Sequence, residues 1–125
     1  MFDITPEVIL ERASLASYNK GREYYRNRRI KSVQFNQEKL AFSATVLGTR
    51  LYDIHLQFDS SGRLDNTNCT CPAYDDRWGC CKHIVAVLLL IEEKDGQGFF
   101  IFFYTLKKLF DIFHYIKLIT TDAQA

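Results

Sequence analysis

Residues 69–83, CTCPAYDDRWGCCKH, hold all four cysteines of the chain and one of its three histidines. Cys69, Cys71, Cys81 and His83 form the spacing CxCx9CxH, in which a nine-residue loop joins two pairs of metal-binding side chains. Three thiolates and one imidazole are donors of the closed tetrahedral type that structural zinc sites use. The one-residue gap suits an extended strand, where residues i and i+2 point to the same side. The stretch therefore predicts one Zn²⁺ ion that ties two parts of the chain together.

Cys80 leaves several alternatives open. Adjacent residues rarely both reach one metal, so we assign Cys81 as the ligand because it completes the CxH pair, and Cys80 as a spare thiol or a packing residue. Two disulfides and a reactive Cys80 are the competing interpretations. A catalytic zinc is disfavoured because four protein ligands leave no position for water. The pattern therefore indicates a structural metal and no enzyme.

Size and composition predict one soluble domain. The chain has 125 residues, of which 47% are hydrophobic and 25% charged. This length allows a single core, so we expect a domain at residues 1–95 and an aromatic-rich helical tail at 96–125. The start, MFDITPEVILERAS, has acidic residues and lacks the apolar run and cleavage site of a secretory signal. We therefore expect a cytoplasmic protein, in which clustered cysteines more often bind metal than form disulfides.

Local patterns predict an α+β fold. Thr5, Pro6 and Glu7 form the start signal of a helix from about residue 6 to 19, with Gly21 as its stop or a kink. From Ile30 to Phe58 the apolar period changes to two, which predicts a small antiparallel β-meander of three strands. The apolar run after His83 predicts a buried helix over residues 82–94. The zinc site thus leads into a buried helix, followed by a C-terminal amphipathic helix.

Positive charge is concentrated in residues 20–31. Six cations there face only Glu23, so the segment carries +5 while the rest of the chain carries −4. A solvated helix face is the plain interpretation, and a polyanion-binding surface is the alternative. Tyr24, Tyr25 and Trp78 add rings for stacking, which supports binding to nucleic acid. The candidate nucleic-acid-binding residues are Lys20, Arg22, Arg26, Arg28, Arg29 and Lys31.

The tail from Phe99 to Ile119 is rich in aromatic residues. Four charges interrupt it, so we predict no transmembrane helix. As a helix it has one apolar stripe, which either packs on the chain's own sheet or serves self-association, a protein partner or an amphipathic membrane contact. The stripe consists of Phe99, Phe102, Leu106, Leu109, Phe113 and Ile116.

The cysteine segment, with CTCP at its start and CKHIVAVLLL at its end, resembles the SWIM-type zinc finger. Cys69, Cys71, Cys81 and His83 match the four ligand positions of that family. The upstream stretches YNKGREYYRNRRIKSVQF and ATVLGTRLYDIHL are similar to the segment that precedes this finger in bacterial SWI/SNF-type helicases. The resemblance covers roughly residues 8–94; Cys80 and everything after Gly96 depart from the family pattern.

The resemblance implies a non-catalytic module that binds DNA or protein partners. No GxxxxGK[ST] phosphate loop occurs in the sequence, so these residues are not the helicase motor. Three hypotheses follow: an accessory region of a SWI/SNF-type helicase that binds nucleic acid, a protein-interaction module that docks through residues 99–119, and a truncated helicase fragment. We expect no small-molecule substrate.

Overall fold

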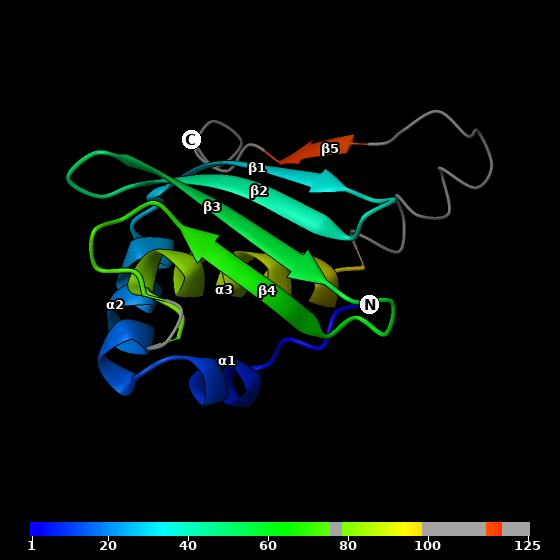
Figure 1. The fold of residues 1–125 in the computed structure, drawn as a ribbon, viewed down its shortest axis with the longest axis horizontal. Helices are drawn as coiled ribbons and strands as arrows, with labels where there is room; N and C mark the ends of the chain where they lie inside the picture. Colours follow the sequence, from blue (N-terminus) through cyan, green and yellow to red (C-terminus); the bar gives the residue numbers. More distant parts are fainter. Residues whose placement is uncertain (76–78, 99–114, 119–125) are drawn as a thin grey trace.

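The computed structural model describes residues 1–75, 79–98 and 115–118, and within them it confirms the predicted α+β class (Figure 1). Helices lie on one side of an antiparallel sheet whose strand order is β4-β3-β2-β1-β5. Trp78, which was expected to offer a ring for stacking, and most of the tail lie outside the described residues. The helices are α1 (Pro6–Arg12), α2 (Leu15–Arg26) and α3 (Lys82–Gly96). The strands are β1 (Ile30–Asn36), β2 (Ala41–Leu47), β3 (Leu51–Phe58), β4 (Leu64–Cys69) and β5 (Tyr115–Leu118).

The N-terminal helical region consists of two helices, where one over residues 6–19 was predicted. The Thr5 hydroxyl accepts the Val8 N–H at 3.1 Å, so the predicted start is confirmed. Ala13 is extended, with φ −140° and ψ 151°, and ends the first helix. The Ser14 hydroxyl accepts the Ser17 N–H at 3.1 Å and starts the second. Ser14 is thus a second N-cap, and its preference for that position breaks the expected single helix.

Gly21 lies inside α2, so its prediction as a helix stop is wrong. A Cβ atom at this position would lie 2.4 Å from Cγ1 of Val85 on α3. The missing side chain therefore lets the two helices approach closely, and packing explains the glycine better than helix termination does.

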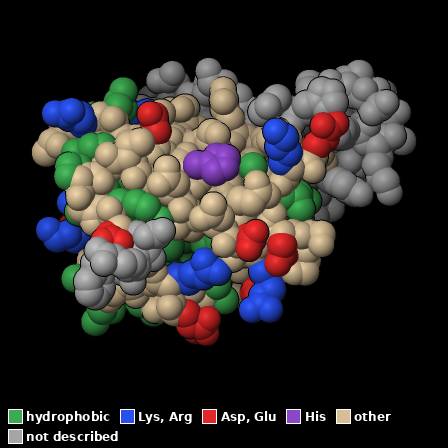
Figure 2. All heavy atoms as spheres, viewed as in Figure 1, with side chains coloured by type: hydrophobic (Ala, Val, Ile, Leu, Met, Phe, Trp, Pro, Cys, Tyr) green, Lys and Arg blue, Asp and Glu red, His purple; other side chains and the backbone are tan. Residues whose placement is uncertain are grey.

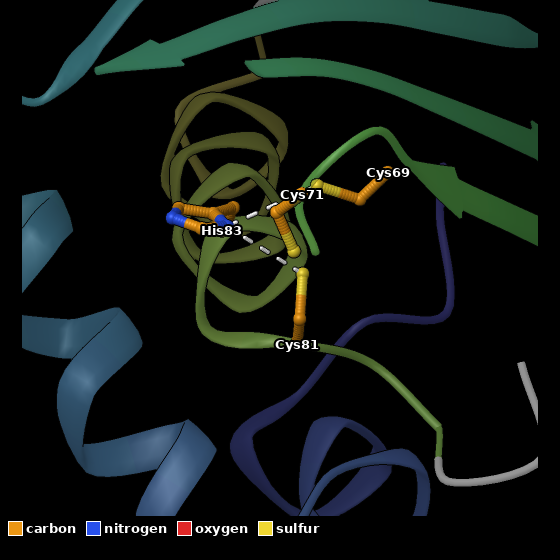
Figure 3. Close-up of side chains that lie close together, drawn as sticks. All are labelled: Cys69, Cys71, Cys81 and His83. Atoms are coloured by element: carbon orange, nitrogen blue, oxygen red, sulfur yellow. Dashed lines mark hydrogen bonds between the residues drawn. The ribbon is translucent and has the colours of Figure 1, made fainter. Parts of the chain in front are cut away.

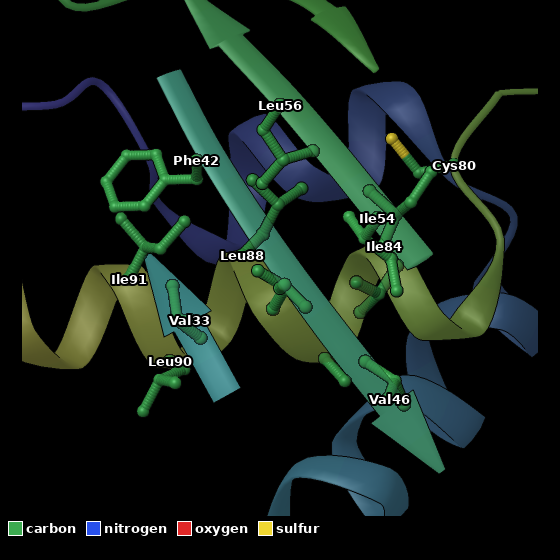
Figure 4. Close-up of a cluster of buried hydrophobic side chains, with 14 of the residues drawn as sticks. Val33, Phe42, Val46, Ile54, Leu56, Cys80, Ile84, Leu88, Leu90 and Ile91 are labelled. Atoms are coloured by element: carbon green, nitrogen blue, oxygen red, sulfur yellow. The ribbon is translucent and has the colours of Figure 1, made fainter. Parts of the chain in front are cut away.

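The three predicted strands are confirmed, and β4 extends the meander. Sequence reasoning missed β4 because LDNTNC has too few apolar residues to alternate. The apolar side chains of the strands face α3, whose residues 83–88, 90 and 91 are buried (Figure 4). The helix is apolar on nearly every side because the sheet covers one face and α2 packs against another. Figure 4 shows the contact between strand residues Val33, Phe42, Val46, Ile54 and Leu56 and helix residues Ile84, Leu88 and Ile91.

The other face of the sheet is polar, as expected for an antiparallel sheet with one solvated side (Figure 2). His55 is exposed there, as predicted. A shallow hollow of about 410 Å³ lies on this face. Hydroxyl and amide side chains dominate its lining, which includes Gln34, Ser43, Thr45, Asn68 and Thr70.

The tail contributes a strand where a helix was predicted. Residues 115–118 pair antiparallel with β1, from Val33 opposite Leu118 to Asn36 opposite Tyr115. The helical prediction is therefore wrong at these four residues, because pairing satisfies backbone groups along the edge of β1 that a helix would leave unpaired. The rest of the predicted stripe, up to Phe113, lies outside the described residues. Among the helices that the structure describes, none has the length and apolarity to span a membrane.

Candidate metal centre

The four predicted ligands come together between the end of β4 and the start of α3 (Figure 3). Cys69 is the last residue of β4, and Cys71 follows two positions later. Cys81 is the N-cap of α3, and His83 lies in the first turn. Their candidate ligand atoms all lie within 4.8 Å of one another. The strand end and the helix start therefore supply two ligands each, as the spacing predicted.

The cluster has the donor set and the size for zinc. The Nδ1 atom of His83 lies 3.9 Å from the Sγ of Cys69 and 3.8 Å from the Sγ of Cys81. In a tetrahedral site with ordinary Zn–S and Zn–N bonds, neighbouring donors are about 3.5–3.8 Å apart. The imidazole therefore presents Nδ1 to the thiols, and the cluster is able to hold one Zn²⁺ ion with only a small contraction.

Hydrogen bonds and burial set the protonation of the thiols. The hydrogen bond from Cys69, with help from His83 and the Ile84 N–H, lowers the pKa of Cys81 to about 4. The same hydrogen bond raises the pKa of Cys69, and burial raises the pKa of Cys71. Cys81 is thus the thiolate that would first attract a cation, while Cys69 and Cys71 must release protons to bind it.

Cys80 belongs to the hydrophobic core. Its side chain lies beside Ile54 and Ile84, and only 3% of the residue is exposed (Figure 4). Burial raises the pKa of this thiol to about 11. Its backbone N–H donates to the Arg12 carbonyl at 2.7 Å, which ties the loop to α1. The structure therefore places Cys81 in the cluster with Cys69, Cys71 and His83, and Cys80 in the hydrophobic core. None of the four cysteines, all within the described residues, forms a disulfide.

Two tyrosine rings enclose the His83 imidazole. The Tyr24 ring meets it at 5.2 Å between centroids and an interplanar angle of 79°, and the Tyr52 ring at 4.8 Å and 40°. The Nε2 atom is buried without a hydrogen-bond partner, and Figure 3 shows it pointing away from the cysteines. A Cβ atom on Gly48 would lie 3.2 Å from Nε2, so the glycine leaves room for the ring.

The predicted basic residues run from α2 to the start of β1, and one of them, Arg29, lies over the Tyr24 ring that meets His83. Lys20, Arg22 and Arg26 lie on α2, and the remaining three lie on the connection to β1 or at the start of β1. Two cations that the sequence analysis did not assign to this surface join them. Arg50 is exposed in the β2–β3 turn, which follows Leu47, the last residue of β2, whose N–H donates to the Arg29 carbonyl at 2.8 Å. Lys82 reaches the Tyr24 ring, with Nζ 5.4 Å from its centroid. Arg50 and Lys82 lie far from residues 20–31 in the sequence, so no local pattern connects them with that segment.

Cations lie over two of the tyrosine rings on α2, one of which, Tyr24, was expected to stack. The Arg29 guanidinium lies 5.9 Å from the Tyr24 centroid, and the Arg22 guanidinium lies 5.9 Å from the Tyr18 centroid. Tyr24 and Tyr25 are both half-buried. The surface around α2 therefore presents cations more than open aromatic faces.

A comparison with protein families gives a match to the SWIM zinc finger over residues 52–92. The matched segment contains all four residues of the cluster, together with nearly all of β3, the whole of β4 and most of α3. This family consists of non-catalytic binding modules, which agrees with a ligand shell closed by four side chains. No match was found among curated proteins or among solved structures.

Proposed function

We propose that this chain is a zinc-stabilised, non-catalytic module that binds nucleic acid, in the first place DNA, as an accessory region of a SWI/SNF-type helicase in the cytoplasm. The domain is residues 1–95, residues 96–125 form an appended tail, and no small molecule is turned over. Binding takes place on what we call the basic surface: Lys20, Arg22, Arg26, Arg28, Arg29, Lys31, Arg50 and Lys82.

The observation that carries the proposal is uncompensated charge on a rigid support. Within the described residues, Lys20, Arg22, Arg26 and Arg29 form no ion pair with a carboxylate. Ion pairs with nearby carboxylates on the surface would otherwise offset part of the positive charge of this segment. Contact with phosphates needs positive charge held near a fixed scaffold, and here α2, the β2–β3 turn and the zinc site provide one.

The geometry favours phosphate contact over recognition of bases. The cations over Tyr18 and Tyr24 occupy ring faces that a base would need for stacking. We therefore expect binding that depends weakly on sequence and strongly on salt. The logarithm of the affinity should fall with the logarithm of the salt concentration, with a slope of about −0.9 for each phosphate neutralised.

A salt titration of a labelled duplex, followed by fluorescence anisotropy, tests the proposal. The variant Arg26→Glu/Arg29→Glu should lose about ten-fold or more in affinity at low salt and should show a shallower salt slope. The matched control, Lys39→Glu/Arg63→Glu, makes the same change in net charge with two exposed cations elsewhere on the surface. Undetectable binding at low salt, or equal losses in the two variants, would contradict the proposal.

The second candidate is a protein-interaction module that docks a helicase or another partner through Phe99 to Ile119. The observation that favours it is β5, because a terminal strand of a sheet offers backbone groups to a further strand. Deletion of residues 99–125 separates the two functions, since it should abolish partner capture and leave duplex binding intact. The reading frame downstream of the chain would show whether it is a fragment of a longer helicase.

A further inference from the structure

We infer that Tyr24 is a positioning residue that couples the metal site to the basic surface, so that zinc and a polyanion each strengthen the binding of the other. The inference rests on the proposed function and adds its regulation. It concerns the ring of one half-buried tyrosine on α2, which touches a metal ligand and the cations of the basic surface together.

The contacts of Tyr24 form a short chain between the two sites. Its ring meets the His83 imidazole nearly at right angles, at 5.2 Å between centroids. The Arg29 guanidinium and the Lys82 ammonium lie 5.9 Å and 5.4 Å from the Tyr24 centroid. One aromatic ring therefore touches the ligand His83 and positions two cations that approach a phosphate.

Backbone bonds tie the same residues together. The Arg29 N–H donates to the Tyr24 carbonyl at 3.0 Å, and the Leu47 N–H donates to the Arg29 carbonyl at 2.8 Å. On its other side the imidazole meets Tyr52, whose hydroxyl bonds Thr49 at 2.7 Å in the β2–β3 turn. The imidazole thus stands between two tyrosines, and each leads to a segment that carries cations of the basic surface.

Metal binding fixes the orientation of this imidazole, because Nδ1 then points at the ion and the ring no longer rotates. A fixed imidazole limits the positions open to Tyr24, and a fixed Tyr24 limits those open to Arg29 and Lys82. Cations that are already ordered lose less conformational freedom when they bind a phosphate. Linkage then requires a polyanion to raise the affinity for zinc by the same factor as zinc raises the affinity for the polyanion.

The experiment measures the affinity for zinc by chelator competition, with and without a saturating DNA duplex. In the wild-type protein the duplex should raise this affinity about five-fold or more. Tyr24→Leu should reduce the effect to less than about two-fold, whereas Tyr24→Phe, which keeps the ring, should retain it. The matched control is Tyr18→Leu, because Tyr18 lies on the same helix and carries Arg22 over its ring, but it has no ring contact with His83.

A second variant keeps the inference testable if Tyr24→Leu folds poorly. Arg29→Gln/Lys82→Gln leaves the Tyr24–His83 contact intact and removes the cations above the ring, so it should bind zinc normally and lose the coupling. Coupling that survives in this variant, or that Tyr18→Leu removes equally, overturns the inference. Duplex binding with a zinc affinity that the duplex leaves unchanged overturns the inference and spares the proposed function. A zinc-loaded protein that binds no duplex overturns both.

Discussion

Each end of the sheet is stabilised by a different kind of interaction. At one end, where β4 ends and α3 begins, three cysteines and His83 converge on a metal site. At the other end, phenylalanine rings meet beneath the N-terminal segment: Phe2 lies 5.8, 5.4 and 4.7 Å from Phe35, Phe42 and Phe58 between ring centroids. The metal end depends on zinc and pH, whereas the aromatic end depends mainly on apolar burial.

Both ends are fastened to α3. The metal ligands Cys81 and His83 lie at its N-terminus. Near its C-terminus, the Asp95 carboxylate accepts the Phe2 N–H at 2.8 Å, while the Asp3 N–H donates to the Gly62 carbonyl at 2.8 Å. The apolar helix between them packs on the sheet along most of its length. Loss of one fastening should therefore loosen that end first and leave the other end folded.

The largest effect should come from removing the metal. Structural zinc contributes on the order of 10 kcal/mol to the folding of small zinc peptides. From sequence we predict that Cys69→Ser or chelation unfolds residues 66 to about 94. The structure narrows this expectation, since seven buried apolar residues of α3, from Ile84 to Ile91, pack in the core and hold the helix independently of the metal. Hydrogen exchange should therefore accelerate most at residues 66–83 and least around Phe35 and Phe42. Equal acceleration at both ends would contradict the comparison.

The next largest effect should come from the aromatic end. Phe42 is fully buried and touches Phe2, Phe35 and Phe58. Phe42→Ala should lower the free energy of unfolding by about 3–5 kcal/mol, because it removes a large side chain and leaves a cavity. Urea denaturation measures this loss, and chelator competition should show a zinc affinity close to that of the wild type. A parallel loss of zinc affinity would mean that the two ends are not independent.

The comparison also shows which features a sequence reveals. The cysteine and histidine cluster was predictable because its spacing is local. Strands β1, β2 and β3 were predictable because burial on one face imposes a period, and α3 was predictable from its apolar run, whose length and context favour a helix. The break at Ala13 had a local signal too, namely Ser14 as an N-cap. The contact of Tyr24 with His83, the approach of Lys82 and Arg50 to the basic residues, and the pairing of β5 with β1 join residues far apart in the chain. No local pattern encodes such contacts.

Two glycine substitutions distinguish the effect of close packing between α2 and α3 from the effect of helix propensity. Gly21→Ala should lower the free energy of unfolding by about 1–3 kcal/mol, because the new Cβ atom would overlap Val85. Gly96→Ala is the matched control, since this helical glycine has no atom within 4 Å of a Cβ position. Alanine there should be neutral or stabilise by up to about 1 kcal/mol. Thermal denaturation of the two variants measures both effects. If both substitutions stabilise the protein, a steric overlap of the new Cβ atom with Val85 is excluded.

The smallest effect should come from the cysteine that lies next to a ligand and faces the core. Cys80→Ala removes one buried sulfur, which should lower the free energy of unfolding by about 1 kcal/mol and leave one zinc bound per chain. Cys81→Ala, one residue later, should abolish zinc binding. Elemental analysis of the two purified variants distinguishes them. Alkylation gives an independent test, because the buried Cys80 thiol, with its pKa raised to about 11, should react only when the protein unfolds. Loss of zinc in Cys80→Ala would place this cysteine in the metal site and remove the division between ligand and core on which the comparison rests.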